Sequence, residues 1–291
     1  MRRAALTGRA WRGVADARRV VSRNGSASSA LTALGDADRD HADAWLSATS
    51  VRHVAYRAAH PVPDATVAVV CVSNRPHLLS DVVSNIQRQC ELAPGRLEIV
   101  YVANHDGADP DAIRNAFGQM APLQVDLPPA GTSLGAALNR GMAQTQARFV
   151  AKFDDDDIYG AHHLADSLRA HSYCGAGVVG KHSYYAHFPE NDTTVLRFPG
   201  REFSYSSTLA GGTLVIDRDR VGDLAFDDIS LGEDRAFLAA CHRRGVSTFA
   251  ADRFNFTQIR STHNTWQPGD QAFMAGARPV DPTDDVHRID R

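Results

Sequence analysis

Residues 133–160 read SLGAALNRGMAQTQARFVAKFDDDDIYG and place a helix pattern, an apolar run and four aspartates in direct succession. Ser133 is a good helix cap, and apolar residues recur at helical spacing after it. The apolar run over residues 148–153 is typical of a strand that is covered on both faces. Asp154–Asp157 follow directly. The stretch therefore predicts a helix and a buried strand that ends in an acidic loop.

The segments before this stretch show the same alternation of strand and helix. Val-rich runs over residues 66–72 and 97–102, and a shorter run over 123–127, predict three more strands. Asn74 is placed to cap the helix after the first run, with Pro76 in its first turn. Strands and helices that alternate at this spacing predict an α/β fold with a doubly wound, mostly parallel sheet and helices on both faces.

The rest of the chain is less regular. A strand over residues 212–216, a helix over 234–244 and a strand over 247–251 are expected in the second half. Pro61 and Pro63 mark a boundary, so we expect an N-terminal helical extension over 1–62 and a main domain over 63–278. Residues 279–291 form a C-terminal tail.

Composition excludes several classes of protein. The chain has 291 residues, 43% of them hydrophobic and 22% charged, as in ordinary globular proteins. Its longest apolar runs are six residues, far below the roughly 20 that cross a membrane. The four cysteines show no short spacing, which argues against zinc knuckles and disulfide frameworks. The arginine-rich start contains no apolar stretch typical of a secretory signal, so we expect a cytoplasmic protein.

Charge is distributed unevenly along the chain. Residues 1–60 hold ten arginines against five acidic residues, whereas the remainder is acidic. The acidic main body argues against a nucleic-acid partner. The basic extension fits an amphipathic helix on a membrane surface or, as we favour, a helix packed on the main domain, so we expect at most peripheral membrane association. Of the 31 cationic residues only Lys152 and Lys181 are lysines, which we attribute to genomic base bias.

Four adjacent carboxylates need a counter-cation if the loop is partly buried. Asp154 and Asp156 lie on the same side if the chain is extended there. Oxygen ligands of this kind favour Mg²⁺ or Mn²⁺, which commonly bind substrate phosphates as well. A solvated acidic loop and a calcium loop are the alternatives, and Tyr159 stands where a calcium loop has an oxygen ligand.

Several motifs together resemble family 2 glycosyltransferases of the GT-A fold. The stretch 133–160 resembles the family's helix, strand and Asp-x-Asp-Asp loop, and Ser73-Asn74-Arg75-Pro76 resembles its nucleotide-binding turn. Gly211-Gly212-Thr213, Gly232-Glu233-Asp234 and His263-Asn264-Thr265-Trp266 follow in the family's order. Where the family usually has a base-contacting acid after the second strand, this chain has Ala103.

The resemblance implies roles for particular residues. Asp156 would bind the metal, Asp154 would contact the ribose or complete the metal shell, and His263 would be a further metal ligand or a structural residue. Asp234 would be the general base, and Glu233 would orient the acceptor. The residues implied for the nucleotide sugar are Ser73, Asn74, Arg75, Asn104, Asp106, Asn139, Asp154 and Gly212. Residues 63–160 would form the nucleotide-binding half and residues 161–278 the acceptor half.

The activity implied is metal-dependent, inverting glycosyl transfer. A nucleoside-diphosphate sugar, with UDP favoured, would be the donor, Mn²⁺ or Mg²⁺ the cofactor, and a sugar-containing or other hydroxyl compound the acceptor. A sugar-nucleotide pyrophosphorylase usually needs a Gly-rich turn after the first strand, and the turn here has no glycine. A non-catalytic carbohydrate- or metal-binding relative and a glycosidase are further alternatives, although four clustered aspartates are poorly suited to acid catalysis.

Overall fold

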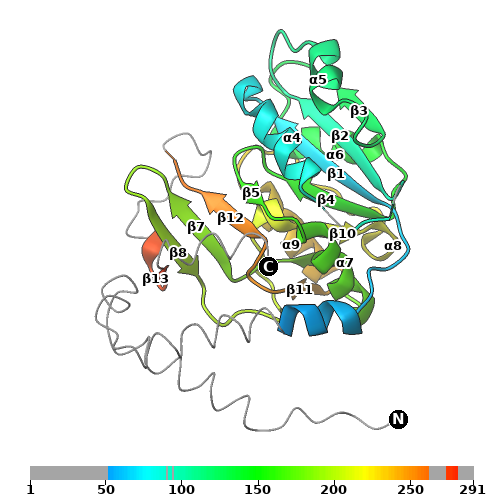
Figure 1. Ribbon diagram of the computed structural model, residues 1–291. Helices are drawn as coiled ribbons and strands as arrows, with labels where there is room; N and C mark the ends of the chain where they lie inside the picture. Colours follow the sequence, from blue (N-terminus) through cyan, green and yellow to red (C-terminus); the bar gives the residue numbers. More distant parts are fainter. Residues whose placement is uncertain (1–51, 90, 94, 262–272, 281–291) are drawn as a thin grey trace, which may run out of the picture.

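The computed structural model describes residues 52–89, 91–93, 95–261 and 273–280 (Figure 1). The first strands are β1 Val67–Ser73, β2 Leu97–Ala103, β3 Leu123–Asp126, β4 Phe149–Phe153, β5 Ile158–Tyr159, β6 Val178–Gly180 and β7 Tyr184–Phe188. They are followed by β8 Thr193–Arg197, β9 Ser204–Tyr205, β10 Val215–Asp217, β11 Thr248–Ala250, β12 Phe256–Ile259 and β13 Arg278–Val280. The helices are α4 Leu79–Gln87, α5 Pro110–Phe117, α6 Leu134–Ala143, α7 His163–Cys174, α8 Arg218–Val221 and α9 Glu233–Arg243, together with a helix over residues 52–59.

The main sheet confirms the predicted α/β architecture. Its strand order is β3-β2-β1-β4-β10-β6-β11-β9, and β3, β2, β1 and β4 are mutually parallel. The chain moves outward from β1 to β3 and then returns to the other side of β1 as β4. The strand order thus reverses between β1 and β4, which is where open α/β sheets bind ligands.

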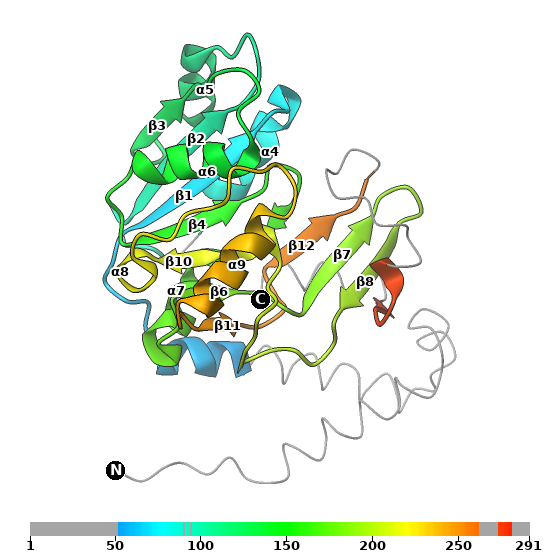
Figure 2. The ribbon, with the colours of Figure 1, turned by 180° about the vertical axis from the view of Figure 1, so that it is seen from behind.

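Helices cover both faces of this sheet, as predicted. Val67, Val69 and Cys71 of β1 pack into the core that contains the apolar side chains of α4, α5 and α7. Val70 points the other way, into a second core with residues of α6 and α9. Successive strand residues face opposite sides, so a fully apolar strand supplies two cores at once. Figure 2 shows α6 and α9 on the face opposite to α4 and α7.

The second half adds two features that the sequence pattern did not predict. Strand β10 runs antiparallel to both β4 and β6, so it interrupts the parallel order. A separate five-stranded sheet has the order β13-β8-β7-β12-β5 and lies beside the main sheet (Figure 1). Its member β13 contains the predicted boundary at residue 278.

The ends of the helices test two predicted caps. Ser133 caps α6 as predicted, since its hydroxyl accepts a hydrogen bond from the backbone N–H of Ala136 at 3.2 Å. The predicted cap at Asn74 is wrong. Pro76 begins a short 3₁₀ turn over Pro76–Leu78 that has no side-chain cap, and α4 starts only at Leu79.

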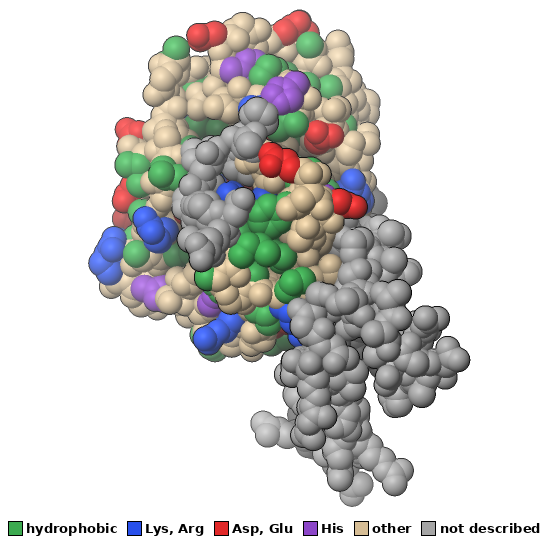
Figure 3. Space-filling model, turned by 90° about the vertical axis from the view of Figure 1, so that its left-hand side faces the viewer, with side chains coloured by type: hydrophobic (Ala, Val, Ile, Leu, Met, Phe, Trp, Pro, Cys, Tyr) green, Lys and Arg blue, Asp and Glu red, His purple; other side chains and the backbone are tan. Residues whose placement is uncertain are grey.

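The helix over residues 52–59 lies against α7. Arg57 donates to both carboxylate oxygens of Asp166, at 3.1 and 2.8 Å, and the Tyr56 and Tyr173 hydroxyls are 3.1 Å apart. No helix among the described residues is both long and apolar enough to cross a membrane. On the side shown in Figure 3, acidic side chains of the described residues lie in the upper and middle parts of the view and basic ones in the middle and lower parts.

Candidate active site

The four aspartates after β4 form two alternating pairs. Asp155 and Asp157 are 3% and 4% exposed, whereas the side chains of Asp154 and Asp156 are 33% and 18% exposed. The chain turns here instead of remaining extended, so the condition that we set for Asp154 and Asp156 to lie on the same side is not met, and what alternates along the loop is exposure. These two carboxylates are therefore the more exposed pair, although of the two only Asp156 lines the pocket described below.

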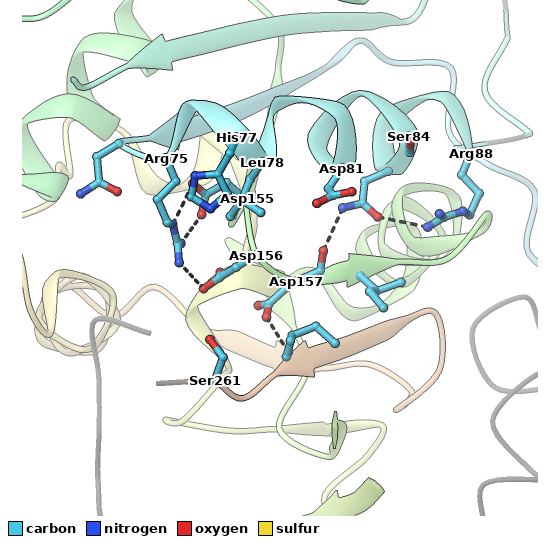
Figure 4. Close-up of a pocket in the computed structure, with 14 residues that line it drawn as sticks. Arg75, His77, Leu78, Asp81, Ser84, Arg88, Asp155, Asp156, Asp157 and Ser261 are labelled. Carbon is cyan, nitrogen blue, oxygen red and sulfur yellow. Dashed lines mark hydrogen bonds and ion pairs between the residues drawn. The ribbon is translucent and has the colours of Figure 1, made fainter. Parts of the chain in front are cut away.

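Arg75 connects the first turn to the acidic loop. Its guanidinium donates to Asp156 Oδ2 at 2.8 Å and to both carboxylate oxygens of Asp155 (Figure 4). The Ser73 hydroxyl donates to Asp155 Oδ2 at 2.6 Å. Burial raises the pKa of Asp155, and these two partners offset only part of that shift. Ser73 and Arg75 thus position the loop, and Asp156 already has a cationic partner.

Asp157 holds the loop in place from the other side. Its Oδ1 accepts from the Ile259 backbone N–H at 2.9 Å, and its carbonyl accepts from the Asn85 amide at 2.8 Å. Burial, together with the neighbouring Asp156 and Asp154, raises the pKa of Asp157 well above its usual range. Asp157 therefore joins β12 and α4 to the loop, and its almost fully buried carboxylate forms part of the wall of the pocket described below.

A pair of glycines separates the two acidic motifs. A Cβ on Gly212 would lie 2.7 Å from Asp154 Oδ2, and a Cβ on Gly211 would lie 1.9 Å from Asp234 Oδ2. Any other residue type would displace one of these carboxylates. The Tyr159 hydroxyl fixes the turn by donating to the Gly212 carbonyl at 2.7 Å and accepting from the Asp154 N–H at 2.7 Å.

Lys152 is a buried cation between the same motifs. Its Nζ lies 2.5 Å from Asp154 Oδ1 and 3.9 Å from Glu233 Oε1. Burial alone would lower the pKa of this amine, but Asp154, Asp234 and Glu233 outweigh burial and raise it. Lys152 therefore remains charged within the site.

Glu233 and Asp234 begin α9 and differ in exposure. Glu233 is 5% exposed, and burial raises its pKa despite the nearby Lys152. Asp234 is half-buried, and its Oδ1 accepts from the Arg235 N–H at 2.5 Å. Both carboxylates lie at the N-terminus of a helix, whose partial positive charge favours them. Asp234 is the more accessible of the two.

The other residues predicted to bind the nucleotide lie at the same edge of the sheet or behind it. Asn104 follows β2 and donates from its amide to the Thr132 carbonyl at 3.0 Å, while Asp106 is exposed. Asn139 lies on α6, and both polar atoms of its amide bond to the Phe226 backbone, at 2.8 and 2.9 Å. This pairing indicates that Asn139 positions the loop before α9.

The donor set fits a divalent cation that is shared with a substrate. Among the described residues no three His, Cys, Asp or Glu side chains are grouped as a metal site. The predicted ligand His263 lies outside the described residues. Asp154 and Asp156 provide two reachable carboxylates, and Mg²⁺ and Mn²⁺ are commonly held by one or two carboxylates plus substrate phosphates. The loop therefore fits a metal that arrives with its phosphate ligands.

A pocket of about 800 Å³ lies between α4 and the acidic loop (Figure 4). Asn74, Arg75 and Asp156 line it, together with Asp81 and Arg88 of α4. Asn74, Arg75 and Asp156 were predicted from the sequence as donor or metal residues.

Sequence reasoning missed Lys152 and Tyr159 as site residues. Lys152 stands in the apolar strand FVAKF, directly before the aspartates, in a chain with only two lysines. That unusual position was the signal available in the sequence. Tyr159 was considered only as a mismatch to a calcium loop, and its bond to Gly212 joins positions 53 residues apart, which no local pattern reveals.

Comparisons with known proteins agree with this fold. The sequence profile described as "Glycosyl transferase family 2" matches residues 67–218. No curated protein gives a significant sequence match. A crystal structure of S. aureus TarS 1-349 in complex with UDP-GlcNAc is similar, with a TM-score of 0.55 at 14% identity over 72% of this chain and 64% of that one.

A second solved structure is the mannosyltransferase PcManGT from Pyrobaculum calidifontis in complex with GDP-Man and Mn²⁺. Its TM-score is 0.55 at 16% identity, over 74% of this chain and 61% of that one. The chain thus spans less than two thirds of either protein, and at these identities the likeness shows the shared fold.

Proposed function

Because the chain belongs to glycosyl transferase family 2 and is a glycosyltransferase, we propose that it moves a sugar from a nucleoside-diphosphate sugar to an acceptor hydroxyl, with a divalent metal and with inversion. The observation that carries the proposal is the glycine pair. Gly212 brings Asp154, and Gly211 brings Asp234, to one turn of the chain. A donor-side acid and an acceptor-side acid thus lie beside the same pair of glycines, as transfer from a donor to an acceptor would require.

The donor side would bind the diphosphate. Asp156 and Asp154 would hold Mn²⁺ or Mg²⁺, with the donor's phosphates as further ligands. When bound, the metal offsets the negative charge that grows on the leaving nucleoside diphosphate. Arg75 now pairs with Asp156, so its guanidinium is close enough to contact a phosphate once a metal takes that carboxylate. We favour UDP as the nucleotide, since TarS binds UDP-GlcNAc.

The acceptor side would remove a proton. We choose Asp234 as the general base because it is only half-buried and its Oδ2 lies beside Gly211, in the turn formed by Gly211 and Gly212 (the glycine turn). Glu233, which is buried against Lys152, would keep the start of α9 in place and orient the acceptor. Attack by the activated hydroxyl in line with the leaving diphosphate inverts the anomeric centre. Family membership removes the pyrophosphorylase and glycosidase alternatives.

Two substitutions test these roles separately. Asp234→Asn keeps the shape of the base but abolishes its basicity, so turnover should fall by about 10²–10⁴-fold while donor affinity persists. Asp156→Asn should weaken binding of the nucleotide with its metal as well as turnover. Calorimetric titration with UDP and Mn²⁺, together with hydrolysis of a panel of nucleotide sugars, measures both. Equal loss of donor affinity in the two variants would overturn the assignment of Asp234, and binding without turnover of any donor would indicate a non-catalytic relative.

A further inference from the structure

Lysine is nearly absent from this chain, and the two lysines present are both buried. Of 31 cationic residues 29 are arginine, and Lys152 and Lys181 are 4% and 2% exposed. At exposed positions arginine can replace lysine with little loss of stability, so a genomic bias toward arginine can remove lysines from the surface. Retention of lysine at two enclosed positions indicates that the shape of the side chain matters at these positions.

The surroundings of Lys152 explain why an ammonium suits that position. Strand β4 lies between β1 and β10, and the Lys152 backbone N–H donates to the Leu214 carbonyl at 2.9 Å, so the backbone has no room to shift. The side chain lies between Asp154 and Glu233. An ammonium is a compact point charge that serves two acids in different directions, whereas a guanidinium is a wide planar fork.

The two acids that Lys152 joins come from separate motifs. Asp154 belongs to the proposed donor side, and Glu233 starts the helix that carries the proposed base. The two motifs also come together at the turn formed by Gly211 and Gly212, where a Cβ on Gly212 would meet Asp154 and a Cβ on Gly211 would meet Asp234. Lys152 supplies a second link, and this one is electrostatic.

We propose that Lys152 is a positioning residue that fixes the spacing between Asp154 and Glu233 and limits the negative charge that Asp154 presents to a bound cation. This inference rests on the proposed glycosyl transfer. It predicts two effects of removing the ammonium. The geometry between donor and base is lost, and Asp154 becomes a stronger ligand for a metal ion.

Lys181 provides a matched control. Its ammonium is equally buried and lies 2.9 Å from the Asp252 carbonyl and 3.3 Å from Asp252 Oδ1. No contact joins its side chain to Asp154, Glu233 or Asp234 among the described interactions. The double substitution Lys181→Met with Asp252→Asn removes a buried lysine and its charged partner together. It leaves in place the Lys181 backbone, which bonds to the Ala210 N–H at 2.7 Å and to the Thr213 hydroxyl at 2.9 Å beside the two glycines.

The first measurement uses Mn²⁺ alone and does not depend on turnover. Free Mn²⁺ is followed by electron paramagnetic resonance in titrations of the full chain. Lys152→Met should bind Mn²⁺ about tenfold more tightly than the wild type, because a neighbouring positive charge has been removed. Lys152→Arg and the Lys181 control should match the wild type. A merely structural role would leave the affinity of Lys152→Met unchanged or weaken it, and either result would overturn the proposal.

The second measurement separates kcat from KM, with UDP-GlcNAc hydrolysis as the probe. Lys152→Met should lower kcat by about 10²-fold with KM almost unchanged, because misplacement acts on the chemical step. Lys152→Arg should remain well below the wild type. Full kcat in Lys152→Arg would refute the need for an ammonium, and an equal loss of kcat in the Lys181 control would refute a role specific to Lys152.

Two safeguards keep the outcomes interpretable. If Lys152→Met does not fold, Lys152→Met with Glu233→Gln removes the unpaired buried acid, and the tighter Mn²⁺ binding should persist in it. Unchanged Mn²⁺ affinity in that variant would overturn the proposal. If the wild type binds and hydrolyses no nucleotide sugar, glycosyl transfer itself is refuted, while the Mn²⁺ titrations still decide whether Lys152 limits the charge at Asp154.

Discussion

Replacing Gly211 by alanine should displace the proposed base without changing its chemistry. The new Cβ would lie 1.9 Å from Asp234 Oδ2, whereas ordinary contacts begin near 3.4 Å. The carboxylate oxygen must therefore move by about 1.5 Å, and a shift of roughly 1 Å in a reacting group can cost about 10²-fold in rate. Asp234 is half-buried, so its carboxylate can turn toward solvent, while its Cβ, 3.1 Å from the new methyl, must shift by a few tenths of an ångström. We expect a loss of stability of about 1 kcal/mol.

The assay is a double-mutant cycle on donor hydrolysis. Gly211→Ala alone should lower kcat by about 10²-fold, with UDP affinity in Mn²⁺ and the thermal midpoint nearly unchanged. In the Asp234→Asn background the same substitution should cost almost nothing further, because the group that it displaces is already inactive. Additive losses would show that the methyl group obstructs the donor sugar and not the base. Wild-type turnover in Gly211→Ala would refute the placement of Asp234 in the reaction.

Three further perturbations test other parts of the molecule. Removing metal with EDTA should weaken UDP binding by about tenfold or more in calorimetric titrations, because Asp156 and the UDP phosphates would bind the same metal ion. Equal affinity with and without EDTA would contradict a metal site. Burial lowers the pKa of His163 to about 3 in the folded chain, whereas the usual pKa of 6.5 applies in the unfolded chain. Below pH 6.5 the unfolded chain therefore binds a proton that the folded chain does not, and the folded state loses stability as the pH falls from 6.5 toward 3. Between pH 8 and pH 5 the free energy of unfolding, measured in urea, should therefore fall by about 2 kcal/mol less in His163→Phe than in the wild type. An identical pH dependence in the two proteins would exclude a neutral buried His163. A truncated chain that begins at Pro61 lacks the Arg57–Asp166 ion pair and should be about 1–3 kcal/mol less stable than one that begins at Arg52, with the same UDP affinity; equal stability would show that the helix over residues 52–59 is dispensable.

The parallel half of the main sheet could be predicted from the sequence because its strands are buried on both faces. A run such as Val67–Val72 has no polar position, which fits only a strand between two layers. Strand direction leaves no such trace, and the antiparallel β10 therefore escaped prediction. The second sheet escaped as well, since β7 pairs with β12 across about 70 residues and its sequence YYAHF carries no clear alternation.

The candidate site shows the same division between local and distant information. Asp154 and Asp156 were identified because alternation along a chain is local, and they are the more exposed pair. The predicted cap at Asn74 failed because Pro76 starts a 3₁₀ turn first. Lys152 was overlooked because its partner Glu233 is 81 positions away, and only the fold brings the two together.

The insertion of β10 between β4 and β6 also determines the order in which the enzyme can be assembled during synthesis. The four parallel strands are complete once residue 153 has left the ribosome, and their contacts span short stretches of chain. The glycine turn, β10 and α9 follow 58 or more residues later. A nascent chain therefore has the edge that we propose for the nucleotide before it has the proposed base Asp234, and the two proposed halves of the site come together only when β10 pairs with β4.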